Sequence, residues 1–315
     1  MSKKILITGG SGFIGSHLCA HFLSEGNEVV CIDNLSTGRK DNIDNLLKNT
    51  SFRFIQGDIC ERSLVEDFKK ENFNEIYHLA SPATVNYVVN HPVEAALANS
   101  VGTKNLLDLA KENKQKILFA SSSEAYGDPL KHPQDESYWG NVNPVGVRSG
   151  YDEGKRFGEA LCMAYNREYD VDTKIVRIFN TYGPNSNPSD SRIIPMFISQ
   201  ALKNIPLTIH GDGLQTRSFC YVSDLVSGII KTMENSIHDP VNLGNEEELT
   251  VIEVAKKIIS KTKSKSKIEF VQRPKDDPSQ RKPDISKARK ELNWQPEISF
   301  DDGLELTIDY FKNIL

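Results

Sequence analysis

KILITGGSGFIG, residues 4–15, is the stretch that decides the fold. Its opening residues are apolar and β-branched, as in a short strand buried inside a parallel sheet. From residue 14 to residue 22 the apolar side chains recur every four positions, which is the spacing of a helix. The glycines between these two patterns therefore lie on a turn from a strand to a helix.

The glycines of this turn have the spacing of a phosphate-binding loop. Gly9 and Gly12 permit a tight turn and let the backbone approach a pyrophosphate, while Gly15 lets the helix pack closely against the strand. Glycine spacing alone is a weak signal, but residues 29–32 form a second apolar strand that ends at Asp33. A carboxylate at this point binds a ribose 2′-hydroxyl and repels a 2′-phosphate. We therefore predict that the chain binds NAD in preference to NADP.

Strand and helix patterns continue to alternate through the first half of the chain. Further strands are predicted at residues 52–55, 75–79 and 116–120, and a long helix at 93–112. This alternation is typical of an α/β fold with a doubly wound parallel (Rossmann) sheet, whose ligands bind beyond the carboxyl ends of the strands. His78 lies inside one of these strands and is interpreted as a hydrogen-bonded core residue.

The regular alternation fades after residue 184, which indicates a second domain. We predict an NAD-binding Rossmann domain over residues 1–183 that carries the catalytic residues. Residues 184–315 are expected to form mainly a smaller, mixed α/β substrate domain, with the chain crossing back near residues 211–244.

The composition restricts the class of partner. The 315 residues carry a net charge of -5, which favours neither nucleic acid nor an anionic membrane surface as a partner. The five cysteines are scattered and form no CxxC pair, so neither a disulfide framework nor a metal site is predicted. No apolar run has the length of a membrane span, and Met1 leads almost directly into the first strand. We expect a cytoplasmic protein.

Tyr151 and Lys155 are candidates for an acid–base pair. Residues four apart share one face of a helix, and Ser149 is a candidate N-cap for a helix that begins here. An ammonium group beside a tyrosine stabilises its phenolate and lowers its pKa, so the pair can take a proton from an alcohol. On their own, a tyrosine and a lysine on an exposed helix face more often have no function.

Other motifs give this pair a context. The glycine-rich turn, Asp33, the serines at 121–123 and the YxxxK pair together resemble the extended short-chain dehydrogenase/reductase family, in its nucleotide-sugar branch. Five further runs resemble the members of that branch that decarboxylate UDP-glucuronate: EAYGDP at 124–129, YDEGKR at 151–156, RIFNTYGP at 177–184, QTRSF at 215–219 and DPSQRKPD at 277–284.

The resemblance implies a UDP-sugar substrate, NAD as cofactor and a redox-neutral reaction. Oxidation of the sugar at C4 makes the C6 carboxylate part of a β-keto acid, which loses carbon dioxide readily. The remaining enolate is protonated at C5 and the ketone is reduced again, so that UDP-glucuronate becomes UDP-xylose through a 4-keto intermediate.

The resemblance also implies roles for individual residues. Tyr151 takes the hydroxyl proton, Ser122 hydrogen-bonds the same oxygen, Lys155 lowers the pKa of the tyrosine, and Glu124 and Arg281 lie near the carboxylate and C5. The substrate-binding residues are expected to be Asn180, Arg192, Arg217 and Arg281. The cofactor-binding residues are expected to be Gly9, Gly12, Phe13, Ile14, Gly15, Asp33, Asn34, Asp58, Ile59, Leu79, Ala80, Ser81, Tyr151 and Lys155.

Alternatives remain open at this stage. UDP-sugar 4-epimerases and nucleotide-sugar 4,6-dehydratases share the scaffold, although Ser123 stands where dTDP-glucose dehydratases have an acidic residue. A scaffold protein that binds NAD without turnover is disfavoured because Tyr151, Lys155 and the serine are all present. Arg217 is the candidate for the diphosphate of the substrate, while Arg281 could serve the diphosphate, the carboxylate or both. Arg281 has another interpretation, as the partner of Asp276 or Asp277 in a surface loop.

Two further expectations rest on the resemblance. Leu97 stands where the decarboxylases usually have a lysine that contacts the substrate, which leaves the identity of the sugar open. We also expect a homodimer, because family members pair the helix near 93–112 with the helix that carries Tyr151. Small residues on both helices, such as Ala96 and Ala160, are compatible with close approach.

Overall fold

A seven-stranded parallel sheet forms the centre of the larger lobe. The computed structural model describes residues 2–272 and 280–315. Neighbouring strands follow the order β11-β6-β5-β4-β1-β2-β3, and every described pair in this sheet is parallel. The strands are β1 (Lys4–Thr8), β2 (Glu28–Asp33), β3 (Phe52–Gln56), β4 (Glu75–His78), β5 (Lys116–Ser122), β6 (Thr173–Ile178) and β11 (Val241–Leu243).

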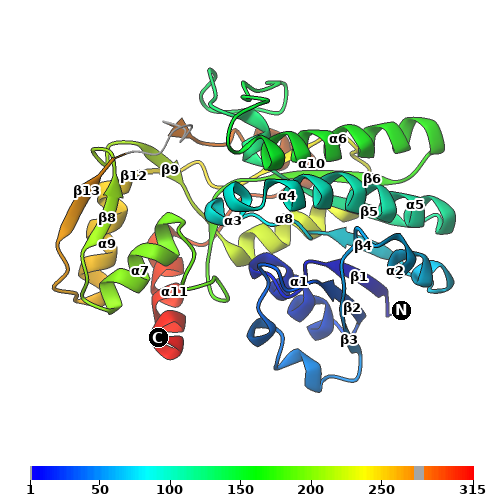
Figure 1. Cartoon of the computed structure of the whole chain (residues 1–315), viewed down its shortest axis with the longest axis horizontal. Helices are drawn as coiled ribbons and strands as arrows, with labels where there is room; N and C mark the ends of the chain where they lie inside the picture. The colour runs from blue at the N-terminus through cyan, green and yellow to red at the C-terminus, as the bar shows by residue number, and fades with distance from the viewer. Residues whose placement is uncertain (1, 273–279) are drawn as a thin grey trace.

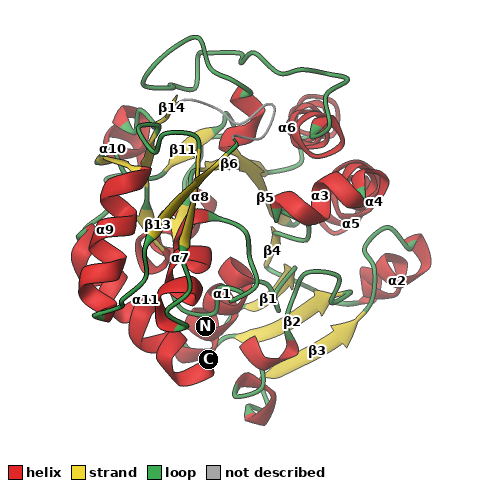
Figure 2. Ribbon diagram, turned by 60° about the vertical axis from the view of Figure 1, so that its left-hand side comes forward, coloured by secondary structure: helices red, strands yellow, loops and turns green. Residues whose placement is uncertain are grey.

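Helices cover both faces of this sheet, and the predicted doubly wound fold is thereby confirmed (Figure 2). One face carries α1 (Phe13–Ser24), α8 (Val222–Glu234) and α10 (Ser286–Leu292). The other face carries α2 (Arg62–Asp67), α3 (Val85–Asn90), α4 (Pro92–Leu97), α5 (Thr103–Asn113) and α6 (Ser149–Tyr169). Short helical turns occupy 40–42, 46–48, 68–70 and 123–126.

A smaller lobe stands beyond the carboxyl ends of the strands, at the left of Figure 1. Its helices are α7 (Ile193–Leu202), α9 (Val251–Thr262) and α11 (Phe300–Ile314). Its strands are β8 (Leu207–His210), β9 (Thr216–Ser218), β12 (Glu248–Thr250), β13 (Ile268–Val271) and β14 (Gln280–Arg281). The short parallel pair β7 (Thr181–Tyr182) and β10 (Cys220–Tyr221) lies where the chain passes between the lobes.

The chain crosses between the lobes more than once. After β9 it returns to the large sheet, where α8 packs on one face and β11 pairs with β6 at the edge. It then runs back to β12 and α9 in the smaller lobe. The lobes therefore share their apolar core, which extends without a break from beneath α1 and α8 to α7, α9 and α11. A second core fills the space between the sheet and the α2, α5 and α6 layer.

The helix predicted at 93–112 is interrupted by a π-helical turn at Ala98–Gly102. Three polar side chains in this region hydrogen-bond to backbone carbonyls four residues earlier: Asn99 to Ala95 at 2.8 Å, Ser100 to Ala96 at 2.7 Å and Thr103 to Asn99 at 2.8 Å. Such side chains compete with the backbone ladder and accompany local widening of a helix. The interruption separates α4 from α5 without changing their direction in Figure 1.

His78 is a buried core residue, as its place in β4 indicated. Its two ring nitrogens lie 2.9 Å from the Thr8 hydroxyl and 3.0 Å from the Thr103 hydroxyl. Burial lowers its pKa to about 3, so the ring is neutral.

Candidate active site

A cavity of about 690 Å³ lies at the carboxyl ends of the parallel strands, where the two lobes meet. The glycine turn and the ends of β4 and β5 line it from the larger lobe. Residues of the 180–197 segment, together with Arg217 and Arg281, line it from the smaller lobe and its connections. This is the position at which a doubly wound sheet binds its ligands.

The glycine turn is shaped for a phosphate group. Gly9 has a φ of +74°, and a Cβ there would lie 2.7 Å from the backbone nitrogen of Ala80. A Cβ at Gly15 would lie 2.1 Å from the carbonyl oxygen of Gly9. Helix α1 begins directly after Gly12, with no side chain capping its first turn. The amides at the start of this helix can therefore bind an anion, as a pyrophosphate requires.

Asp33 ends β2 beside this turn and is held by the backbone. Its carboxylate accepts hydrogen bonds from the amides of Ser11, at 3.1 Å, and Leu35, at 2.8 Å. At the end of the next strand, Asp58 accepts a hydrogen bond of 3.1 Å from the Asn34 side chain. The predicted cofactor residues of β2 and β3 thus lie together.

The predicted cofactor residues fall into two groups in the structure. Those that line the cavity are Gly9, Gly12, Phe13, Ile14, Gly15, Leu79, Ser81, Tyr151 and Lys155. Asp33, Asn34, Asp58, Ile59 and Ala80 lie outside its lining. Ile59 is a buried residue packed under Gly102, and Ala80 donates its amide to the Thr8 hydroxyl at 3.3 Å.

Ser122, Tyr151 and Lys155 meet at the floor of the cavity. Ser122 is the last residue of β5, and Tyr151 lies in the first turn of α6, whose N-cap is Arg148 and not the expected Ser149. The Lys155 ammonium donates a 2.7 Å hydrogen bond to the carbonyl of Ala120 and lies 5.6 Å from the centre of the Tyr151 ring. All three residues line the cavity.

The pKa values of this pair correct the expectation drawn from its spacing. Burial raises the pKa of Tyr151 to about 12, and the Ser122 hydroxyl offsets this only in part. Burial also lowers the pKa of Lys155 to about 7, against the opposing charge of Glu159. A low-polarity site disfavours both charged forms, and here that effect exceeds the stabilisation of the phenolate by the Ser122 hydroxyl and the Arg148 charge. Further positive charge is needed for Tyr151 to act as a base.

Glu124 lies beside these residues in contact with two arginines. Its carboxylate is 3.0 Å from Arg281 Nη2 and 3.3 Å from Arg148 Nη2. Burial favours the neutral acid, but the charges of Arg281, Arg148 and Arg217 hold the pKa of Glu124 below its usual value. Glu124 is therefore ionised at neutral pH.

Arg281 belongs to the buried site and not to a surface loop. Its side chain is 2% exposed, and Nη1 donates a hydrogen bond to the carbonyl of Ser123. Strand β14 pairs with β9 so that Arg281 stands opposite Arg217, which is also buried. The suggested partners Asp276 and Asp277 lie outside the described residues.

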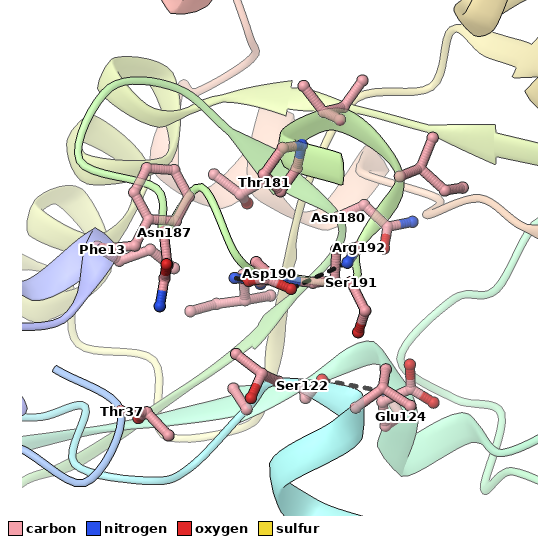
Figure 3. Close-up of a pocket in the computed structure, with 18 of the residues that line it drawn as sticks. Phe13, Thr37, Ser122, Glu124, Asn180, Thr181, Asn187, Asp190, Ser191 and Arg192 are labelled. Carbon is pink, nitrogen blue, oxygen red and sulfur yellow. Dashed lines mark hydrogen bonds and ion pairs between the residues drawn. The ribbon is translucent and has the colours of Figure 1, made fainter. Parts of the chain in front are cut away.

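Asn180 and Arg192 lie on the opposite side of the cavity from Ser122 and Glu124 (Figure 3). Arg192 is bound to Asp190, with distances of 2.8 Å from Nε and 2.6 Å from Nη2 to the same carboxylate oxygen. The structure thus brings all four predicted substrate residues to one cavity, since Arg217 and Arg281 line it as well.

Several cavity residues were missed in the sequence. Arg148 was overlooked because it precedes the YxxxK motif, and the loop that contains Thr37, Arg39 and Asn42 carries no helix or strand pattern. Residues 83–86, 89 and 90 also reach the cavity. For Arg148, a usable signal was its i, i+4 spacing from Asp152.

Leu97 does not line the cavity. Its side chain is 44% exposed on the outer surface of α4. The lining of this cavity gives no support to a substrate contact at position 97, and the question that Leu97 raised about the sugar is left to the product test.

Within residues 2–272 and 280–315 there is no group of three or more His, Cys, Asp or Glu side chains arranged to hold a metal ion. No helix in the same ranges has the length and apolar character needed to cross a membrane.

The fold and the site together define a nicotinamide-dependent enzyme of the extended short-chain dehydrogenase/reductase type. Residues 6–307 match the family model described as GDP-mannose 4,6 dehydratase. The chain is 47% identical to UDP-glucuronic acid decarboxylase 1 of Arabidopsis thaliana, over 98% of this chain and 70% of the relative. It is 46% identical to UDP-glucuronic acid decarboxylase 1 of Danio rerio, over 99% of this chain and 73% of the relative. The chain therefore belongs to the UDP-glucuronic acid decarboxylase family.

Solved structures of two other activities have the same fold. A UDP-glucose 4-epimerase from Thermotoga maritima with UDP-glucose matches with a TM-score of 0.92 and 29% identity, over 99% of both chains. A dTDP-glucose 4,6-dehydratase from Streptomyces venezuelae with NAD bound matches with a TM-score of 0.90 and 27% identity, over 98% of this chain and 97% of that one. The fold alone therefore does not select among these reactions.

Proposed function

We propose that this chain catalyses the NAD-dependent decarboxylation of UDP-glucuronate to UDP-xylose through a 4-keto intermediate. The observation that carries the proposal is the cluster of Glu124, Arg148 and Arg281 beside Ser122 and Tyr151. An alcohol-oxidising pair thus stands next to a buried, net cationic group of side chains. A substrate with both a sugar hydroxyl and a carboxylate satisfies both parts, because a buried carboxylate must be paired with cations.

The glycine turn and Asp33 fit NAD. Gly9, Gly12 and Gly15 line the cavity at the start of α1, whose free amides can bind a pyrophosphate, and the lack of a Cβ at Gly15 lets the helix pack against the backbone of Gly9. Asp33 would hold the adenosine ribose and disfavour a 2′-phosphate. When bound, NAD supplies a hydride acceptor for the sugar C4 and a positively charged ring that favours the phenolate of Tyr151.

Each side chain of the site has a separate role in the reaction of the substrate. Tyr151 takes the proton of the C4 hydroxyl, and Ser122 hydrogen-bonds the same oxygen. As carbon dioxide leaves, the electron pair of the broken bond between C5 and the carboxylate carbon moves toward the C4 oxygen. Tyr151 and Ser122 donate hydrogen bonds to the negative charge that develops there. Because the pKa of Glu124 is held low, this residue is better suited to orient the two arginines than to donate the proton at C5.

Two other reactions of the same scaffold are weighed against this proposal. A 4-epimerase also needs cations for the diphosphate of its substrate, but it only removes and returns a hydride, so it has no need of the Glu124 carboxylate among those cations. A 4,6-dehydratase of the dTDP-glucose type needs an acid to expel the C6 hydroxyl, and Ser123 is a poor acid. The carbonyl of Ser123 binds Arg281, and its side chain is buried.

Mass spectrometry of the product tests the reaction directly. The purified protein with NAD is incubated separately with UDP-glucuronate, UDP-glucose and dTDP-glucose. We expect loss of carbon dioxide from UDP-glucuronate and no change in the other two. Loss of water, or conversion of UDP-glucose to an isomer with UDP-glucuronate untouched, would replace the proposal with a dehydratase or an epimerase.

We also propose that the protein is a homodimer that pairs the α4 and α6 faces of two copies. Apolar side chains are exposed on this face, among them Val93 at 68%, Leu97 at 44% and Phe157 at 51%. Helices α4 and α6 pack side by side (Figure 1). Exposed apolar patches of this kind commonly mark an interface. A monomeric mass in light scattering at micromolar concentration would reject the dimer, as would an unchanged dimer in the variant Val93→Glu with Phe157→Glu.

A further inference from the structure

Arg148 is the arginine of the cluster with the fewest contacts to the protein. Its ion pair with Glu124 spans 3.3 Å, and the next carboxylate, that of Asp152, is 4.0 Å away. Its Nε is buried, yet it finds no hydrogen-bond partner among residues 2–272 and 280–315. Buried donors are nearly always paired, so an unpaired one in a ligand site calls for a partner from the ligand.

Arg281 is held quite differently. Its Nη1 binds the carbonyl of Ser123 and its Nη2 binds Glu124, while its whole side chain is almost fully buried. The two terminal nitrogens of Arg281 are therefore already engaged by the protein. Arg148 lines the same cavity and its side chain is 15% exposed; among the described residues, its ion-pair partners are the Glu124 and Asp152 carboxylates.

The charges around Glu124 add a second argument. A sugar carboxylate that enters the cavity brings a second negative charge close to an ionised Glu124, and like charges repel unless a cation lies between them. Arg148 contacts Glu124 and also faces the cavity, so its guanidinium can serve both carboxylates. Asp152 lies one helical turn further along α6 and approaches the same guanidinium nitrogen.

We propose that Arg148 binds the carboxylate of the substrate and thereby sets the preference of the site for an acidic sugar. This inference rests on the proposed function, because it needs a substrate with a carboxylate. Arg281 then has the different task of fixing Glu124 and the Ser123 backbone, and Asp152 positions Arg148.

The test measures binding without turnover. In the Tyr151→Phe background with NAD bound, calorimetric titration gives the affinity for UDP-glucuronate and for UDP-xylose, which lacks the carboxylate. Arg148→Ala is expected to weaken the binding of UDP-glucuronate at least about tenfold and that of UDP-xylose less than about twofold. Only UDP-glucuronate loses a charge-assisted contact in this variant. Arg167→Ala, at the exposed far end of the same helix, is the matched control and is expected to change neither.

A second background separates a direct contact from an effect through Glu124. Removing Arg148 leaves Glu124 with one cation fewer, which could repel the ligand without any contact having been lost. With Glu124→Gln present, that repulsion is absent, and Arg148→Ala is still expected to weaken UDP-glucuronate selectively. If Arg148→Ala folds poorly, Arg148→Gln takes its place, because it keeps most of the side-chain volume. It is expected to show the same selective loss of affinity for UDP-glucuronate.

The outcomes distinguish this inference from the function on which it rests. The role of Arg148 is overturned if Arg148→Ala weakens the binding of both ligands equally, or if the loss of affinity for UDP-glucuronate disappears in the Glu124→Gln background. In either case the wild type would still decarboxylate UDP-glucuronate. Failure of the wild type to release carbon dioxide from UDP-glucuronate overturns the proposed function itself.

Discussion

The cofactor half and the substrate half of the cavity are built in opposite ways. The cofactor half comes from neighbouring residues: Gly9 and Gly12 lie on one turn, Gly15 lies at the start of α1, and Asp33 stands beside the turn at the end of the next strand, outside the cavity lining. The substrate half joins Glu124, Arg148, Arg217 and Arg281, which come from four separate segments and both lobes. The first is fixed by backbone shape, the second by ion pairs that depend on the whole fold. Variants of the two halves should therefore fail differently.

The largest effect is expected at the junction of the two halves, for Tyr151→Phe. The substitution removes the hydroxyl that exchanges the proton but keeps the ring, so turnover should fall by about 10²–10⁴ while NAD affinity stays within about twofold. Steady-state kinetics and a cofactor titration measure the two quantities. Activity close to that of the wild type would reject the role of Tyr151.

Next in size is Arg281→Ala, in the substrate half. It removes the partner of Glu124 and the contact with the Ser123 backbone, so kcat/KM for UDP-glucuronate should fall by about 10² through lost positioning.

Glu124→Ala should instead permit oxidation at C4 but slow the release of carbon dioxide, with reduced nicotinamide accumulating on the enzyme. Normal decarboxylation by both variants would place the carboxylate chemistry elsewhere.

A smaller effect is expected in the cofactor half, for the choice between NAD and NADP. The wild type should bind NAD at least about tenfold more tightly, or by ~1.4 kcal/mol, because Asp33 repels a 2′-phosphate. Asp33→Asn should narrow this gap and leave the affinity for UDP-xylose unchanged. Equal affinities of the wild type for the two cofactors, measured by fluorescence titration, would contradict the role of Asp33.

The last prediction concerns stability and not activity, namely its pH dependence in the substrate half. Burial, and next the negative charge of Glu124, raise the pKa of Asp152 from 3.8 to about 7, although Arg148 and Arg281 oppose this. The folded protein therefore binds the proton more tightly, and ionisation of Asp152 costs stability progressively as the pH rises from about 4 to about 7. Asp152→Asn removes this cost.

The gain in unfolding temperature from Asp152→Asn should therefore be larger at pH 8 than at pH 5. The comparison with the wild type at each pH cancels the opposite contribution of Lys155, whose penalty is present below pH 7 and is lost as the pH rises above it. A gain that is independent of pH, or larger at pH 5, would show that Asp152 does not titrate in this way.

The sequence predicted the cofactor half far better than the substrate half, for a physical reason. Backbone demands, such as a positive φ at Gly9, leave their mark on single residues and short spacings. Arg148 has only its i, i+4 spacing from Asp152 as a mark in the sequence, because its role arises when the fold brings it against Glu124. Burial is likewise a property of the assembled fold, which is why spacing alone gave the wrong direction for the pKa of Tyr151. The π-helical turn at 98–102 was missed because its cause, side-chain bonds to the backbone, is invisible to apolar periodicity.

The bond between Arg281 and the carbonyl of Ser123 has a consequence for substitutions at position 123. The acceptor is a backbone atom, so it is present whichever amino acid occupies position 123. An acidic residue introduced at this position would therefore leave in place the acceptor that anchors Arg281. The anchoring of Arg281 and the side-chain chemistry of position 123 are in this way independent.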